Sequence, residues 1–165
     1  MKLSSKSTNV VSELASDDRL TLWLSIKPTF AGLITSGEKT VELRRTKPSA
    51  SAGDIALIYA SSPERSLVGA AVIACVLCLT PTELWPHVKD CAGVDRQQFD
   101  DYFEGASTAV GIWFEDVHVL QKPITLAKVR NKLPGFHPPQ TYRYLTQRNI
   151  RSLGLSSCLN ELTAF

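Results

Sequence analysis

The alternation of apolar and polar residues predicts a series of strands and short helices that begins near residue 20. Residues 22–26 alternate between apolar and polar side chains, which is typical of a half-buried strand. Pro28 suits the first turn of a helix, and Gly37 supplies the usual end of one. Alternation resumes over residues 39–45 and predicts a second strand directly after this turn.

Four further strands are predicted, at residues 54–60, 67–79, 108–114 and 117–126. The polar turn at residues 61–66 makes the first two of these a hairpin. Pro123 lacks an N–H group for a strand ladder, so it places the last of them at a sheet edge or a bulge.

Three helices are predicted in the second half of the chain. Pro81 opens the first, and Pro86 is expected to interrupt it. Asp95 and Gln98 resemble a capping box for the second, which is expected to end at Gly105. The last helix is predicted to begin at Pro138 and Pro139 and to carry Tyr142, Arg143, Leu145 and Arg148.

About six strands with short helices between them predict an α+β fold built round a mixed, barrel-like sheet, and exclude a doubly wound fold. A chain of 165 residues is long enough for one core but too short for two. We expect a flexible N-terminal arm at residues 1–19, a folded domain at 20–148 and a C-terminal extension at 149–165.

The composition excludes several classes of protein. With 44% hydrophobic, 21% charged and 8% aromatic residues, the chain is neither disordered, collagen-like nor a coiled coil. Its longest uncharged apolar run, residues 67–79, is too short to cross a bilayer. The first residues lack the apolar stretch of a secretory signal, so a cytoplasmic location without membrane contact is expected.

Charge is distributed unevenly along the chain, although the net charge is only +2. Residues 81–117 contain eight acidic and two basic side chains, whereas residues 118–165 contain seven basic and one acidic. A basic C-terminal third attracts a polyanion, but a solvated helical surface accounts for the same charges.

The cysteines and histidines do not predict a metal site. Cys75 and Cys78 have the C-x-x-C spacing, but strand residues three apart point to opposite faces, and no second ligand pair follows at zinc-finger spacing. Both are expected to be buried, reduced and free of metal.

One motif carries more information than the rest of the sequence. Residues 37–44, GEKTVELR, form a G-x-K-x-x-E-x-R pattern at a predicted helix-to-strand junction, with Ser25-Ile26-Lys27-Pro28 before it and a strand after Gly53. Over roughly residues 22–146 the chain resembles the ASCH family, whose fold is similar to the PUA domains of RNA-modification enzymes. The resemblance implies a β-barrel with a cleft beside the motif that binds RNA or a nucleotide-like ligand.

The chemistry of the motif residues suits an anionic ligand. Gly37 permits a positive φ, and Lys39 is expected to place its ammonium at the surface of the cleft. Glu42 and Arg44 share one face of the strand, where they pair either with each other or with separate parts of a ligand. Arg45 points the other way.

Further ligand-binding candidates lie outside the motif. Lys27 and Ser61 are at strand ends beside it, and Tyr59 either stacks on a base or belongs to the core. Tyr142 and Arg143 form a basic and aromatic pair suited to a nucleic-acid strand, unless the helix packs the tyrosine inward.

Three functions remain open at this stage. The first is binding of RNA or a nucleotide. In the second, Lys39 and Glu42 are catalytic in a ribonuclease or in an amidohydrolase acting on an acylated (N4-acetyl) cytidine. The amidohydrolase relatives have a hydroxyl three residues after the motif lysine, so Thr40 or Ser107 would have to replace Glu42 in that role. The third is a protein-interaction module of the transcription-coactivator type that uses residues 81–117. No cofactor is expected, and a divalent metal enters only if the protein is a nuclease.

Overall fold

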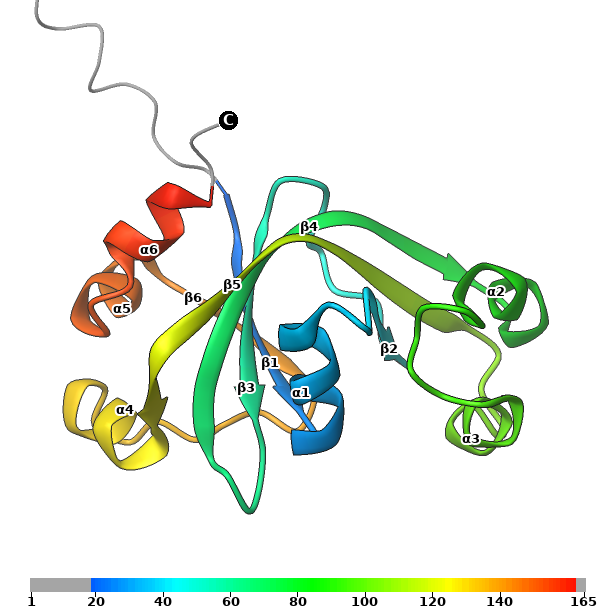
Figure 1. Cartoon of the computed structure of the whole chain (residues 1–165), viewed down its shortest axis with the longest axis horizontal. Helices are drawn as coiled ribbons and strands as arrows, with labels where there is room; N and C mark the ends of the chain where they lie inside the picture. Colours follow the sequence, from blue (N-terminus) through cyan, green and yellow to red (C-terminus); the bar gives the residue numbers. More distant parts are fainter. Residues whose placement is uncertain (1–18, 163–165) are drawn as a thin grey trace, which may run out of the picture.

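The computed structural model describes residues 19–162, in which a curled six-stranded sheet carries short helices on its faces and edges (Figure 1). The predicted N-terminal arm lies outside the described residues except for Arg19. The strands are β1 Thr21–Ile26, β2 Val41–Arg44, β3 Ile55–Ala60, β4 Ser66–Leu79, β5 Ala109–Thr125 and β6 Tyr142–Leu145. The helices are α1 Pro28–Ser36, α2 Pro81–Val88, α3 Arg96–Tyr102, α4 Leu126–Lys132, α5 Gln147–Ser152 and α6 Ser156–Glu161.

The strands lie in the order β2-β5-β4-β3-β1-β6. The β1 and β3 strands are parallel, and the other neighbouring pairs are antiparallel. The sheet is therefore mixed and curls into a half barrel, which confirms the predicted α+β fold with about six strands.

The two longest strands, β4 and β5, run through the whole molecule. The register between them shifts at three places, and Asp116 in β5 has a φ of 48°. Bulges let one ladder bend without ending. The sequence predicted two strands here, at 108–114 and 117–126, but they are the two halves of a single bent strand.

The predicted helix from Pro138 is wrong. Tyr142–Leu145 is β6, which pairs antiparallel with the outer edge of β1, and a helix begins only at Gln147. Alternating aromatic side chains favour a strand, and the open edge of β1 supplies hydrogen bonds that an isolated turn of helix would lack.

Two helical details also differ from the prediction. The α2 helix continues through Pro86, because the loss of one hydrogen bond does not end a helix that Leu84 and Val88 hold in the core. The α4 helix was not predicted; it follows β5 directly, and the Thr125 side chain caps its first turn.

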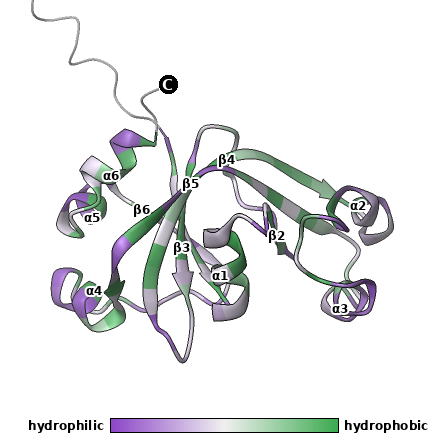
Figure 2. Ribbon diagram, viewed as in Figure 1, coloured by the Kyte–Doolittle hydropathy of each residue, from purple (hydrophilic) through white to green (hydrophobic). Residues whose placement is uncertain are grey.

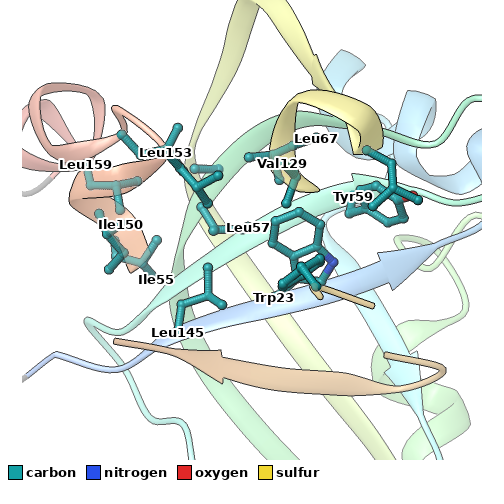
Figure 3. Packing of buried hydrophobic residues seen from close by; sticks show 14 of the residues in the cluster. Trp23, Ile55, Leu57, Tyr59, Leu67, Val129, Leu145, Ile150, Leu153 and Leu159 are labelled. Carbon is teal, nitrogen blue, oxygen red and sulfur yellow. The ribbon is translucent and has the colours of Figure 1, made fainter. Parts of the chain in front are cut away.

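The apolar residues form three clusters. The first lies between one face of the sheet and the helices α4, α5 and α6, and Figure 3 shows Trp23 and Tyr59 meeting Val129 there. The second lies under α1 on the other face. The third, around Phe99 and Leu84, holds α2 and α3 against β2 and the far ends of β4 and β5. We call this third unit, with α2 and α3, the acidic lobe, since residues 81–105 contain six acidic and two basic side chains.

Two sequence predictions concern membranes and thiols. None of the helices within residues 19–162 is long and apolar enough to cross a membrane.

Cys75 and Cys78 are free but exposed, so the prediction that they are buried is wrong. This end of β4 extends beyond the partner register of β3, and the sheet therefore leaves both thiols uncovered.

Candidate functional site

A cleft of about 870 Å³ opens where the ends of β1 and β3 face the acidic lobe. In Figure 1, α4 and α3 lie on opposite sides of the lower part of the molecule, with α1 between them. The cleft is lined mainly by the end of β1 with α1, by Lys39 with β2, by the end of β3 with the following turn, by the α3 helix, and by the segment Pro138–Gln140.

Three buried charges of the motif line the cleft. The Lys39 Nζ lies 3.4 Å from a Glu42 carboxylate oxygen, and the Arg44 guanidinium lies 3.1 Å from the other oxygen. Lys39 is only 2% exposed, and its ammonium also donates a hydrogen bond to the Ala92 carbonyl. Of the two alternatives for Glu42 and Arg44, the structure shows the pairing with each other. The expected surface position of Lys39 is wrong, because residue 92 of the acidic lobe covers it.

Burial and charge act in opposite directions on Lys39. Desolvation lowers the pKa of its ammonium below the ordinary value, and the adjacent Glu42 carboxylate partly opposes this by favouring the charged form. The Phe30 ring, whose centroid is 5.2 Å from Nζ, adds a cation–π contact.

The local fold explains why the motif lies here. Gly37 ends α1 with a φ of 84°, and its N–H donates to the Ile34 carbonyl. The Lys39 N–H then donates to Leu33 and the Thr40 N–H to Cys91, which joins the turn to the acidic lobe. The β2 strand follows and pairs with β5, so the side chains of Glu42 and Arg44 lie on the cleft side.

Arg44 connects distant segments. Its guanidinium donates to the Ser25 carbonyl at 2.9 Å and to the Thr141 carbonyl at 2.8 Å. Two atoms of cleft residues, Arg44 Nε and Ser25 Oγ, are buried and find no hydrogen-bond partner within residues 19–162. Unpaired buried polar atoms are uncommon and often mark a site that binds a ligand or water.

The wall opposite the acidic lobe carries cations and hydroxyl groups. Tyr59 at the end of β3 lines the cleft together with Ser61, Ser62 and Arg65 of the following turn, and Lys27 adds a second exposed cation. Burial raises the pKa of the Tyr59 phenol above its ordinary value, against a lowering effect from the positive charges of Arg65 and Arg130. The phenol is therefore protonated at neutral pH.

The α3 helix supplies the facing wall through Gln98, Phe99, Asp101 and Tyr102. The Tyr102 hydroxyl donates to the Leu43 carbonyl, and burial raises the pKa of this phenol as well. The capping box that begins α3 is present as predicted, since the Gln98 N–H donates to the N-cap carboxylate.

The structure brings together six of the residues predicted for the site. They are Lys27, Lys39, Glu42, Arg44, Tyr59 and Ser61. Four others lie outside the cleft lining: Gly37, Arg45, Tyr142 and Arg143.

The contacts of Arg45, Tyr142 and Arg143 explain their positions. Arg45 donates to the carbonyls of Tyr102 and Glu104, and the Tyr142 hydroxyl donates to the Lys47 carbonyl. The Arg143 guanidinium lies 4.9 Å from the centre of the Phe136 ring.

Sequence reasoning missed several lining residues. Arg65 lay in a turn that the sequence marked only as polar, and Tyr102 lay in a predicted helix to which no site residue was assigned. Pro138, Pro139 and Gln140 were assigned to a helix, so the extended path that takes them along the cleft had no signal in the pattern.

The comparison with protein families agrees with this geometry. The family model of the ASCH domain matches residues 24–125, which include the motif and most of the cleft lining. The chain belongs to the ASCH family.

Two comparisons describe related ASCH proteins. The chain is 33% identical over 136 residues to an ASCH domain-containing ribonuclease of Zymomonas mobilis, covering 82% of this chain and 91% of that protein. The crystal structure of ASCH from Zymomonas mobilis superposes with a TM-score of 0.78 at 32% identity, covering 83% and 95% of the two chains. A hypothetical protein from Leishmania major, at 12% identity and a TM-score of 0.54 over 88% and 98% of the chains, shares the fold alone.

Proposed function

We propose that this ASCH protein binds RNA in the cleft and cleaves it there. The observation that carries the proposal is the placement of the exposed cations Arg65 and Lys27 and of the Tyr59 phenol around one cleft that is also lined by aromatic side chains. The relative from Zymomonas mobilis, which is similar over most of its length, is named a ribonuclease and supports the same activity.

The cleft suits an unpaired nucleotide. Its volume falls in the range of about 300–1,000 Å³ that is usual for small-molecule sites. Unpaired bases stack on aromatic side chains, and Phe30 and Tyr102 are available among the lining residues. Phosphate groups are anionic, so Lys27 and Arg65 are the groups that attract them.

Cleavage at a ribose needs no co-reactant. The 2′ oxygen forms a bond to phosphorus while the bond from phosphorus to the 5′ oxygen breaks, one proton leaves the 2′ hydroxyl and one joins the departing oxygen. The Arg65 guanidinium is positioned to offset the charge that grows on the phosphate. Tyr59 belongs to the first apolar cluster and is only 2% exposed, but it borders the cleft, and its protonated phenol is assigned as the proton donor for the leaving oxygen.

Lys39 and Glu42 are assigned a supporting role in this proposal. Each lines the cleft, but each is bound to the other and to protein groups. Their charges set the electrostatic environment at the floor of the cleft and fix the position of Arg44. A direct role of the Lys39 amine as a base stays a prediction.

The amidohydrolase alternative finds less support. Glu42 occupies the position of the expected hydroxyl and is paired with two cations. Thr40 and Ser107, which were considered as replacements, are both exposed and neither lines the cleft.

Incubation of a labelled single-stranded RNA with the purified protein tests the proposal, with retention and fragmentation both measured. Parallel reactions with and without EDTA decide whether a divalent cation is needed. Arg65→Gln and Tyr59→Phe are expected to reduce fragmentation by about 10²-fold or more, as is usual for loss of a charge-stabilising or proton-transfer group.

Matched controls separate chemistry from folding. Arg96→Gln and Tyr144→Phe make the same chemical changes at exposed positions outside the cleft and are expected to keep the parent activity. Parent protein that retains and fragments no RNA would refute the proposal, and so would full activity in both cleft variants.

A further inference from the structure

The α4 and α5 helices lie on the same face of the sheet, since Val129 of α4 and Ile150 of α5 belong to one apolar cluster. Figure 1 shows both helices on the side of the molecule opposite the acidic lobe. Six exposed cations lie on these helices and on β6 between them: Lys128, Arg130, Lys132, Arg143, Arg148 and Arg151. We call this surface the basic face.

The basic face is not neutralised by the protein. Between residues 118 and 162 the single acidic side chain is Glu161, against seven lysines and arginines. Within residues 19–162, no ion pair includes a cation of the basic face; Lys39, Arg44 and Arg96, which do form ion pairs, lie outside it. Unpaired charges of one sign on one surface are the electrostatic footprint of a polyanion site.

The basic face is continuous with the cleft. Leu126, the first residue of α4, lines the cleft, and its N–H donates to the carbonyl of the cleft residue Arg65 at 2.8 Å. The segment that leaves α4 returns to the cleft at Pro138–Gln140. Both ends of α4 are thus joined to the cleft wall.

Two arginines of the basic face are fixed by contacts with Phe136, where the segment after α4 returns to the cleft. The Arg130 Nε donates to the Phe136 carbonyl at 3.1 Å, and the Arg143 guanidinium stacks on the ring of the same residue. The position of Phe136, two residues before the first cleft-lining proline, orders both guanidinium groups beside the cleft. Lys128 and Lys132, one helical turn apart on α4, continue the row of positive charge.

The opposite lip of the cleft has the opposite sign. Asp101 lines it and Glu104 is exposed at the end of the same helix, while Asp100 is paired with Arg96. Figure 2 shows α3 as mainly hydrophilic. A phosphate chain that leaves the cleft is repelled on that side and attracted on the other.

We propose that the basic face is a track for the backbone of single-stranded RNA, so that a strand held in the cleft continues over α4 and α5 and not over α3. This inference rests on the proposed function and adds to it the class of substrate. The favoured substrate is a strand several nucleotides long, because a dinucleotide fills the cleft without reaching the outer cations.

The test compares two double variants that remove the same charge. The track variant carries Lys128→Gln and Lys132→Gln. The control variant carries Lys47→Gln and Lys89→Gln, which change exposed lysines that neither line the cleft nor belong to the basic face. Binding of a 12-nucleotide single-stranded RNA and of a dinucleotide is measured at several salt concentrations, and thermal unfolding followed by circular dichroism confirms that both variants fold.

The track variant is expected to bind the 12-nucleotide RNA more weakly. Its plot of log affinity against log salt should be shallower by about 1.4, that is about 0.7 for each lost phosphate contact on a single strand. Dinucleotide binding and cleavage should stay at the parent level. The control variant should match the parent protein with both ligands.

Three results would contradict the proposal that the basic face binds the RNA backbone. The first is an unchanged salt slope in the track variant, the second is an equal change in the control variant, and the third is an equal loss with the dinucleotide. If the parent protein still binds and cuts RNA, each of these leaves the proposed function standing. A parent protein that binds neither RNA would refute both.

Discussion

The Arg44 guanidinium donates a 2.8 Å hydrogen bond to the carbonyl oxygen of Thr141, a residue 97 positions later in the chain. This contact fixes the start of β6 against β2, although the two strands lie at opposite ends of the sheet order. Because residues 138–140 precede Thr141 and line the cleft, Arg44 determines where one wall of the cleft lies.

Replacement of Arg44 by methionine is expected to destabilise the fold by about 3 kcal/mol, because it breaks a buried ion pair and leaves the Glu42 carboxylate with Lys39 alone. The double variant Glu42→Gln with Arg44→Met should lose less than the sum of the two single changes. Urea unfolding of the variants measures this. Arg45→Met is the control, because its exposed hydrogen bonds predict a loss of only about 1 kcal/mol; an Arg44→Met protein as stable as this control would show that Arg44 is not structural.

Lys39→Met is expected to cost about 3 kcal/mol of unfolding free energy, since the ammonium is buried between Glu42 and the Ala92 carbonyl. The surface position that the sequence predicted for Lys39 would correspond to a change of less than about 0.5 kcal/mol, the value usual for a surface site. Lys47→Met, at an exposed position, should show that smaller value. Equal midpoints for the two variants in chemical denaturation would contradict the burial of Lys39.

The raised pKa values of Tyr59 and Tyr102 predict that the folded protein loses stability at alkaline pH. Burial raises the pKa of both phenols above 10.0, so above that pH the unfolded chain releases these protons before the folded protein does. The folded state then binds more protons than the unfolded state, and stability falls as pH rises from about 10 through the folded pKa values. Tyr59→Phe and Tyr102→Phe should each flatten this fall in unfolding measurements from pH 9 to 12. An unchanged pH dependence in both would count against the raised pKa values.

Two glycines predict opposite effects of the same substitution. A Cβ atom at Gly69 in β4 would lie 2.8 Å from the His118 carbonyl oxygen, whereas at Gly32 in α1 it would meet no atom within 4 Å. Gly69→Ala should therefore destabilise the protein by about 1–3 kcal/mol through strain between β4 and β5. Gly32→Ala should stabilise it by about 0.5–1 kcal/mol, because alanine is the better helix former. Thermal unfolding decides whether the two shifts have opposite signs.

The sequence predicted those elements whose signals are local. Gly37 ends α1, Asp95 and Gln98 cap α3, and strand periodicity places Glu42 and Arg44 on one face. Each of these features depends on residues only a few positions apart, where propensity and spacing decide the outcome.

The predictions from the sequence were wrong where contacts between residues far apart in the chain determine the structure. The β6 strand forms because it pairs with the free edge of β1. Lys39 is buried because Ala92, which accepts its hydrogen bond, packs against it. Cys75 and Cys78 are exposed in the part of β4 that runs beyond Val72, the partner of the first β3 residue, Ile55. No window of the sequence contains both partners of any of these contacts, so the pattern of apolar residues could not have shown them.

The opposite charges of the acidic lobe and of the basic face give the protein a permanent electric dipole. Residues 81–105 carry an excess of four negative charges at one end of the long β4 and β5 strands, and the described residues from 118 onward carry an excess of six positive charges toward the other. In the field of a polyanion such a molecule experiences a torque, which turns its positive end toward the approaching chain before any contact is made. Low ionic strength strengthens this alignment, so the first collision already presents α4 and the adjoining mouth of the cleft.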